Sequence, residues 1–75
     1  MKRRPMHQRL AEAVRKRREA GNYNQEEFAD RIQMHRAYYG ELERGKKDFR
    51  ISTLERVCAG LEVPMSDVVR DAEDL

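Results

Sequence analysis

The sequence predicts an all-α protein of five short helices packed in a single bundle. In five separate stretches the apolar residues recur at intervals of three or four, the spacing that places them on one face of a helix. Residues typical of helix ends, such as Gly, Asn, Ser and Pro, stand between these stretches, and no stretch shows strand-like alternation. A chain of 75 residues has room for one modest core. We therefore expect a single domain over residues 1–75, with its core at about residues 6–70 and flexible tails.

The first two helices are expected at residues 6–20 and 25–32. Gly21 ends the first helix, because glycine readily adopts the left-handed conformation of a C-cap. Asn24 begins the second, since its side chain can accept from freed backbone N–H groups while Glu27 completes a capping box. The apolar residues at helical spacing in these two helices are Leu10, Ala11, Ala13, Val14, Phe28, Ala29 and Ile32.

The three remaining helices occupy the second half of the chain. A third helix is expected at residues 35–43, and Gly45 ends it. The fourth is expected to begin near Ser52, which forms a second capping pair with Glu55. Pro64 is expected in the first turn of a short fifth helix. The inward residues of these helices are Tyr39, Leu42, Leu54, Val57, Cys58, Leu61, Met65, Val68 and Val69.

The net charge of +2 conceals a gradient along the chain. Residues 1–20 hold eight Lys and Arg against two Glu, a balance of +6, and residues 21–61 hold seven charges of each sign. Residues 62–75 hold one Arg against five acids, a balance of −4. A basic end favours an anionic partner. The acidic segment 71–75 is expected to point away from that partner and to fray into solvent.

Cysteine, histidine and hydropathy patterns argue against several classes of protein. Cys58 is the only cysteine, so no intrachain disulfide can form and a cytoplasmic location is expected. His7, His35 and Cys58 lack metal-ligand spacing, and the sequence contains no phosphate loop or nucleophile–base pattern. We therefore expect no enzyme, no cofactor and no small-molecule ligand. Neither a secretory signal nor a membrane span is expected.

Residues 25–45 carry a more detailed pattern. Gln25 begins the second predicted helix, Ala29 would let two helices cross closely, and residues 43–45 (Glu-Arg-Gly) close the third. Apolar residues between and beyond them are Ile32, Tyr39, Leu42, Leu54 and Val57. The pattern resembles the phage Cro and repressor family of Xre-type helix-turn-helix proteins, which includes small bacterial controller proteins, and the similarity covers about residues 10–70. It implies a five-helix, lambda-repressor-like DNA-binding domain.

Four residues depart from the family pattern. Asn22, Gln33 and Glu62 stand at or near positions where the family usually has glycine, and Phe49 stands near a usual proline. Asn22 tolerates the left-handed region of backbone conformation. Gln33 and Glu62 tolerate it less readily, so we expect either backbone strain or reshaped turns at these two positions.

The resemblance implies that the N-terminal end of the third helix enters the major groove of double-stranded DNA. Arg36 is the first candidate for reading a base, because a guanidinium can donate two parallel hydrogen bonds to guanine O6 and N7. Ala37 could contact a thymine methyl group. Glu41 could accept from cytosine N4 or pair with a neighbouring cation instead. His35 is a further candidate for a base or phosphate contact, and for His35 and Arg36 the alternative is a solvated surface residue.

Phosphate contacts are expected on either side of the groove. The candidates are Gln25, Tyr38, Arg44, Lys46 and Lys47. For each lysine the alternative is a solvated turn residue. The basic run at residues 15–18, preceded by residues 2–4, is expected to act by long-range steering, because the first helix of this family packs behind the reading helix.

A homodimer is expected, because one reading helix contacts only about four or five base pairs, too few for selective binding. The resemblance and the surplus of apolar residues near the fifth helix place the dimer face at Val63, Met65, Val68 and Val69. The alternative is that these residues pack within one chain.

The sequence therefore predicts a transcriptional regulator, a repressor or controller protein, that binds a palindromic DNA operator as a homodimer. Two alternatives stay open: an antitoxin, and a protein-interaction module that has kept the fold and lost DNA reading. The acidic Glu41 hints at the interaction module. Arg36 and the nearby basic residues argue against it.

Overall fold

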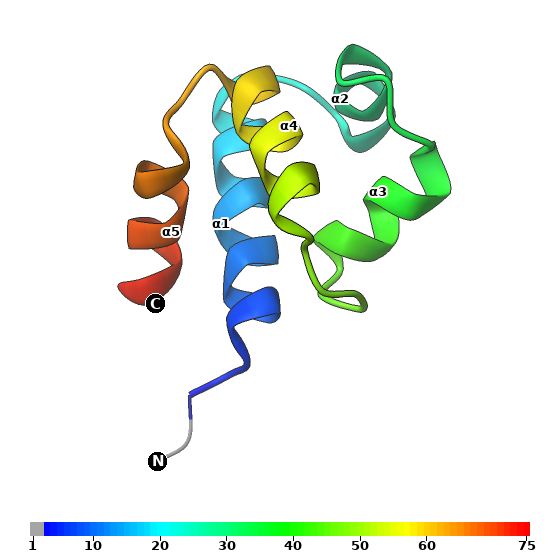
Figure 1. Ribbon diagram of the computed structural model, residues 1–75. Helices are drawn as coiled ribbons and strands as arrows, with labels where there is room; N and C mark the ends of the chain where they lie inside the picture. The colour runs from blue at the N-terminus through cyan, green and yellow to red at the C-terminus, as the bar shows by residue number, and fades with distance from the viewer. Residues whose placement is uncertain (1–2) are drawn as a thin grey trace.

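A computed structural model of the chain describes residues 3–75, which fold into five helices (Figure 1). In chain order these are α1 (Met6–Ala20), α2 (Gln25–Arg31), α3 (Arg36–Glu43), α4 (Ile51–Leu61) and α5 (Met65–Glu73). Helix α1 is central and packs against α3, α4 and α5, with α5 on one side of it and α2 and α3 on the other. No strand occurs among residues 3–75. The predicted all-α, five-helix class is confirmed.

The core forms where the apolar faces of the helices meet. Its largest fully buried side chains are Tyr39, Phe28 and Leu42. The Phe28 ring lies 5.4 Å from the Tyr39 ring and 5.8 Å from the Tyr23 ring, measured between centroids. Side chains of this size each stabilise the fold by about 1.5–3 kcal/mol on burial. The predicted inward residues are confirmed, although Leu61, Met65 and Val69 are only partly buried.

Helix α2 begins as predicted, but α4 and α5 do not. The Asn24 side chain accepts from the backbone N–H of Glu27 at 2.8 Å, and the Glu27 carboxylate accepts from the backbone N–H of Asn24 at 2.9 Å. Helix α4 instead begins at Ile51 and has no side-chain cap, so the predicted Ser52–Glu55 capping pair is wrong. Pro64 precedes the first turn of α5 as its N-cap residue.

The acidic C-terminal segment is more ordered than its composition suggests. Helix α5 continues to Glu73, and Ala72 is completely buried. The Arg17 Nε donates to the Asp71 carboxylate at 2.6 Å. The prediction that residues 71–75 fray is therefore wrong as far as Glu73, because docking against α1 holds this end of the helix. The predicted flexible N-terminal tail includes Met1 and Lys2, which lie outside the described residues.

Three turns keep a left-handed backbone without glycine. The φ angles are 65° at Asn22, 55° at Gln33 and 60° at Glu62. The turns before α2, before α3 and after α4 therefore keep the left-handed geometry instead of being reshaped. Left-handed conformations of non-glycine residues carry strain of about 1–3 kcal/mol, with asparagine the most tolerant. Gln33 is strained in this way, and it lies in the turn that determines the orientation of α3 relative to α2.

Candidate nucleic-acid interface

Helix α3 has one buried face and an exposed N-terminal end. Tyr39, Leu42 and Glu43 point inward and are buried. Arg36 and Ala37 are exposed at the first turn, directly after the exposed His35. The His35 side chain makes no capping hydrogen bond, so it does not serve the helix start. Three of the four residues predicted to read bases, His35, Arg36 and Ala37, thus share one accessible end of the helix, and Glu41 lies further along it.

Arg36 is held by carboxylates of α2. Its Nε donates to Asp30 Oδ1 at 3.1 Å and its Nη2 donates to Asp30 Oδ2 at 2.7 Å. Its Nη1 lies 3.7 Å from a Glu26 carboxylate oxygen. The guanidinium lowers the pKa of the Asp30 carboxyl through these hydrogen bonds, and Asp30 raises the pKa of Arg36. More than half of the Arg36 side chain, 56%, stays exposed in this pair.

Lys47, in the turn after α3, lies beside Tyr38 and Glu41 of that helix, so three predicted contacts come together. The Lys47 ammonium lies 3.8 Å from a Glu41 carboxylate oxygen and 5.8 Å from the centroid of the Tyr38 ring. Glu41 therefore takes the cation-paired arrangement that the sequence left open. Lys47 carries its positive charge beside Tyr38, as a joint phosphate contact would require.

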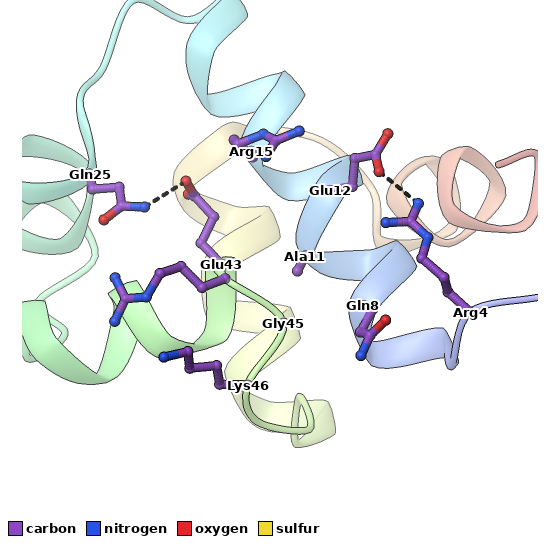
Figure 2. A pocket seen from close by; sticks show the side chains of 10 residues that line it. Arg4, Gln8, Ala11, Glu12, Arg15, Gln25, Glu43, Gly45 and Lys46 are labelled. Atoms are coloured by element: carbon purple, nitrogen blue, oxygen red, sulfur yellow. Dashed lines mark hydrogen bonds and ion pairs between the residues drawn. The ribbon is translucent and has the colours of Figure 1, made fainter.

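A cleft of about 480 Å³ opens between α1 and the turn that follows α3 (Figure 2). Gln25, Arg44 and Lys46, three of the predicted phosphate contacts, line it together with Arg4 and Arg15. Arg4 donates to Glu12 at 2.6 Å and is thereby paired. Within residues 3–75, the other three cations of the cleft form no ion pair with a carboxylate. The cleft therefore presents unpaired positive charge from two separate parts of the fold.

Behind this cleft lies a buried polar network centred on Glu43, whose side chain has 0% exposure. Arg18 of α1 donates to both Glu43 carboxylate oxygens, at 2.8 and 2.6 Å. The Tyr39 hydroxyl also donates to this carboxylate, as does the Gln25 amide at 3.1 Å. The network ties α1, α2 and α3 together and fixes the Gln25 amide at the edge of the cleft.

Burial and hydrogen bonding act in opposite directions on Glu43. Burial alone would raise its pKa, but the hydrogen bonds from Arg18, Tyr39 and Gln25 outweigh burial and lower the pKa below its ordinary value. Burial, reinforced by the bond to Glu43, raises the pKa of Tyr39. The network is thus a charged arginine–carboxylate pair with a neutral tyrosine.

Arg15 and Arg4 are the cleft residues for which the sequence predicts another role. Both belong to the basic runs expected to act by long-range steering, yet both line the same cleft as Gln25 and Lys46. Gln8, Ala11 and Arg15 follow one another at helical spacing, which is a signal that they share a face of α1. Which part of the protein that face meets depends on tertiary packing. Lys2, part of the predicted N-terminal basic run, lies outside the described residues.

The sequence of this chain matches a family of known proteins. The model of a helix-turn-helix family matches residues 14–68, which include the whole of α2, α3 and α4. The chain belongs to this helix-turn-helix family. A relative of the helix-turn-helix chain, the control protein C.MunI of Mycoplasma sp., is 37% identical over 57 residues, or 76% of this chain and 77% of the relative.

Solved structures share the whole architecture. The clp gene regulator ClgR of Corynebacterium glutamicum matches with a TM-score of 0.91 at 28% identity, over 96% of this chain and 94% of that chain. The restriction-modification controller protein C.AhdI of Aeromonas hydrophila has the same fold, with a TM-score of 0.78 at 21% identity over 83% and 94% of the two chains. The chain is thus an Xre-type, DNA-binding transcriptional regulator. No helix within residues 3–75 is long and apolar enough to cross a membrane.

The predicted dimer face of this helix-turn-helix protein is only partly accessible. Val68 has 0% exposure and belongs to the core of the single chain, so it is removed from the predicted face. For Val68, the alternative given by the sequence analysis, packing within one chain, is therefore the one observed. Val63, Met65 and Val69 are half-buried, and they stay predicted dimer contacts. Met65 and Val69 belong to α5, and Val63 lies two residues before it. Helix α5 lies across α1 from α3 (Figure 1).

Proposed function

We propose that two copies of this chain bind a palindromic DNA operator, each placing the N-terminal end of α3 in the major groove. The observation that carries this proposal is the position of Arg36, which is the first residue of α3 and is exposed. A two-point arginine–guanine contact discriminates against a wrong base by about 1–3 kcal/mol. Ala37, Glu41 and His35 are proposed as further base contacts along the same helix.

The flanking residues supply affinity and register. Contacts to DNA phosphates are proposed on both sides of Arg36, from Gln25, Tyr38, Arg44, Lys46 and Lys47, with Arg15 added from α1. Such contacts strengthen binding to all sequences and make it depend on salt. The unpaired cations of the cleft and the fixed amide of Gln25 support this assignment.

Dimerisation gives the protein enough base pairs to be selective. One α3 reads about four or five base pairs, and two copies on an inverted repeat double that number. Val63, Met65 and Val69 are proposed as the contact between the copies. The likeness to C.MunI supports a controller-type role. Because the family consists of regulatory DNA-binding proteins, the proposal includes no catalysis.

Selection of duplexes from a randomised pool, at near-physiological salt, tests this function. The wild-type chain is expected to enrich an inverted repeat. Arg36→Ala is expected to lower the preference for the guanine that Arg36 contacts by about ten- to hundredfold, because the two parallel hydrogen bonds are lost. Arg36→Lys is the matched control: it keeps the charge and loses the planar fork, so its binding to random DNA persists while its preference falls.

The interaction-module alternative gives a different result in the same experiment. It predicts that no sequence is enriched, or that binding is salt-sensitive and indifferent to sequence. Either result would overturn the operator proposal. An antitoxin that also binds DNA would enrich an operator and would, in addition, bind a protein partner.

The salt dependence of binding separates direct phosphate contact from long-range steering at α1. Arg15→Ala is expected to make the plot of log K against log salt concentration less steep by about one unit, because one phosphate contact is lost. Lys16→Ala removes the same charge one residue further along α1, but Lys16 pairs with Glu12 at 3.2 Å and does not line the cleft. Equal slopes for the two variants would show that Arg15 acts by steering alone.

A further inference from the structure

We infer that Asp30 sets the base preference of this protein by orienting Arg36, which makes Asp30 a positioning residue for specificity. The inference rests on the proposed function, in which Arg36 reads a base. Asp30 itself contacts no base in this scheme. It acts through the guanidinium that it holds.

The hydrogen-bond geometry leaves the reading edge of Arg36 available. A guanidinium carries five N–H groups, and Asp30 takes one from Nε and one from Nη2. Two N–H groups on Nη1 and one on Nη2 remain. These are the neighbouring donors that can form two parallel hydrogen bonds with guanine O6 and N7. Asp30 can therefore keep its hold while Arg36 contacts a base.

Orientation matters because an unrestrained arginine is an indiscriminate donor. Its long side chain samples many rotamers and binds phosphates as readily as bases. The two-point contact with Asp30, at 3.1 and 2.7 Å, favours one plane and one direction of the guanidinium before DNA arrives. The Arg36 side chain then loses its conformational entropy when the protein folds, and this loss does not weaken DNA binding.

The negative charge of Asp30 also favours base contacts by Arg36 over phosphate contacts. Its side chain is 57% exposed, so its negative charge repels DNA phosphates near Arg36. This repulsion lowers affinity for every sequence and disfavours phosphate contacts by the guanidinium. Glu26 brings similar charge at 3.7 Å from Nη1 but makes no hydrogen bond to Arg36, so it repels without orienting.

The exposed pair contributes little to the fold. Exposed ion pairs of this kind stabilise proteins only weakly. Asp30 can therefore be changed without unfolding the chain, which allows its role in binding to be measured.

Asp30→Asn and Glu26→Gln make a matched pair, because each removes one negative charge from α2. The measurements are affinity for the selected operator, for the operator with the Arg36-contacted guanine replaced, and for a random duplex. Both variants are expected to bind random DNA at least as tightly as the wild type. Only Asp30→Asn is expected to lower the guanine preference, by about two- to tenfold, the scale set by ordering one long side chain. A structural defect would instead weaken binding to all three duplexes.

The same change in the Arg36→Ala background completes the experiment. There Asp30→Asn is expected to leave the remaining base preference unchanged, since the residue it positions is absent. The inference is overturned if Asp30→Asn keeps the wild-type preference, if Glu26→Gln lowers the preference equally, or if the effect persists without Arg36. If the wild-type chain enriches no operator at all, the proposed function fails and the inference fails with it, a result distinct from those three.

Discussion

Arg18→Met is expected to destabilise the protein by about 3–5 kcal/mol, because it leaves a buried carboxylate without its cation. The Glu43 side chain has 0% exposure and receives two hydrogen bonds from Arg18. A chain of 75 residues has a total stability of only about 4–11 kcal/mol. The substitution therefore removes much of the stability, and urea unfolding followed by circular dichroism at pH 7 measures it.

The difference in the free energy of unfolding between the wild type and Arg18→Met is expected to become smaller as the pH falls. In the wild type the Glu43 pKa lies below its ordinary value of 4.5, so the stability it contributes is present above that pH and is lost as the pH falls through the lowered pKa. Without Arg18 the Glu43 pKa rises, because burial is then less opposed. In the variant, Glu43 therefore takes up a proton at a higher pH than in the wild type. This removes the buried unpaired charge and part of the destabilisation. A difference that stays constant between pH 7 and pH 4 would contradict this account.

Arg17→Met is the matched control for this prediction. Arg17 is the neighbouring residue of α1, and its partner Asp71 has a side chain that is 40% exposed. A partly exposed ion pair contributes about 0–1 kcal/mol. Equal losses from the two substitutions would mean that burial of Glu43 does not determine the cost.

Features governed by neighbouring residues were predictable from the sequence. The spacing of Leu10 and Val14 indicated α1, and Asn24 with Glu27 indicated the start of α2. Both signals act within about one helical turn. The start of α4 escaped prediction, because Ser52 resembled a cap while the helix began one residue earlier without one.

Features governed by distant contacts were not predictable in this way. The last turn of α5 is held by Ala72 packing and by the Arg17–Asp71 pair, which joins residues 54 apart in the chain. Composition alone made this acidic segment look like a solvated tail. The burial of Val68, which removed it from the predicted dimer face, likewise depends on how α5 docks in the fold.

The candidate site shows the same division. The predicted bounds of the third helix placed Arg36 and Ala37 at its start, and the family resemblance implied that this end reads bases. The two-point bond between Arg36 and Asp30 depends on the turn between α2 and α3, where Gln33 adopts a positive φ. The cleft brings α1 against the turn after α3, and only tertiary packing determines that contact.

Gly60→Ala is expected to destabilise the protein by about 1–2 kcal/mol, because an overpacking cost of about 2–3 kcal/mol exceeds the gain in helix propensity. A Cβ atom at Gly60 would lie 2.2 Å from Ile32 Cγ2 and 3.2 Å from Phe28 Cζ. Ile32 is buried and β-branched, so its methyl group cannot rotate away freely. The higher helix propensity of alanine offsets only about 1 kcal/mol of this strain. Thermal unfolding followed by circular dichroism measures the net effect.

The expected damage extends from α4 to α2. Ile32 and Phe28 belong to or directly follow α2, so relieving the clash requires α2 to move away from α4. Ile32→Leu in the Gly60→Ala background removes the Cγ2 branch and is expected to restore part of the lost stability. A stable Gly60→Ala single variant, or a double variant no better than the single, would show that the two helices can separate without strain. In that case Gly60 would not fix the distance at which α4 supports α2.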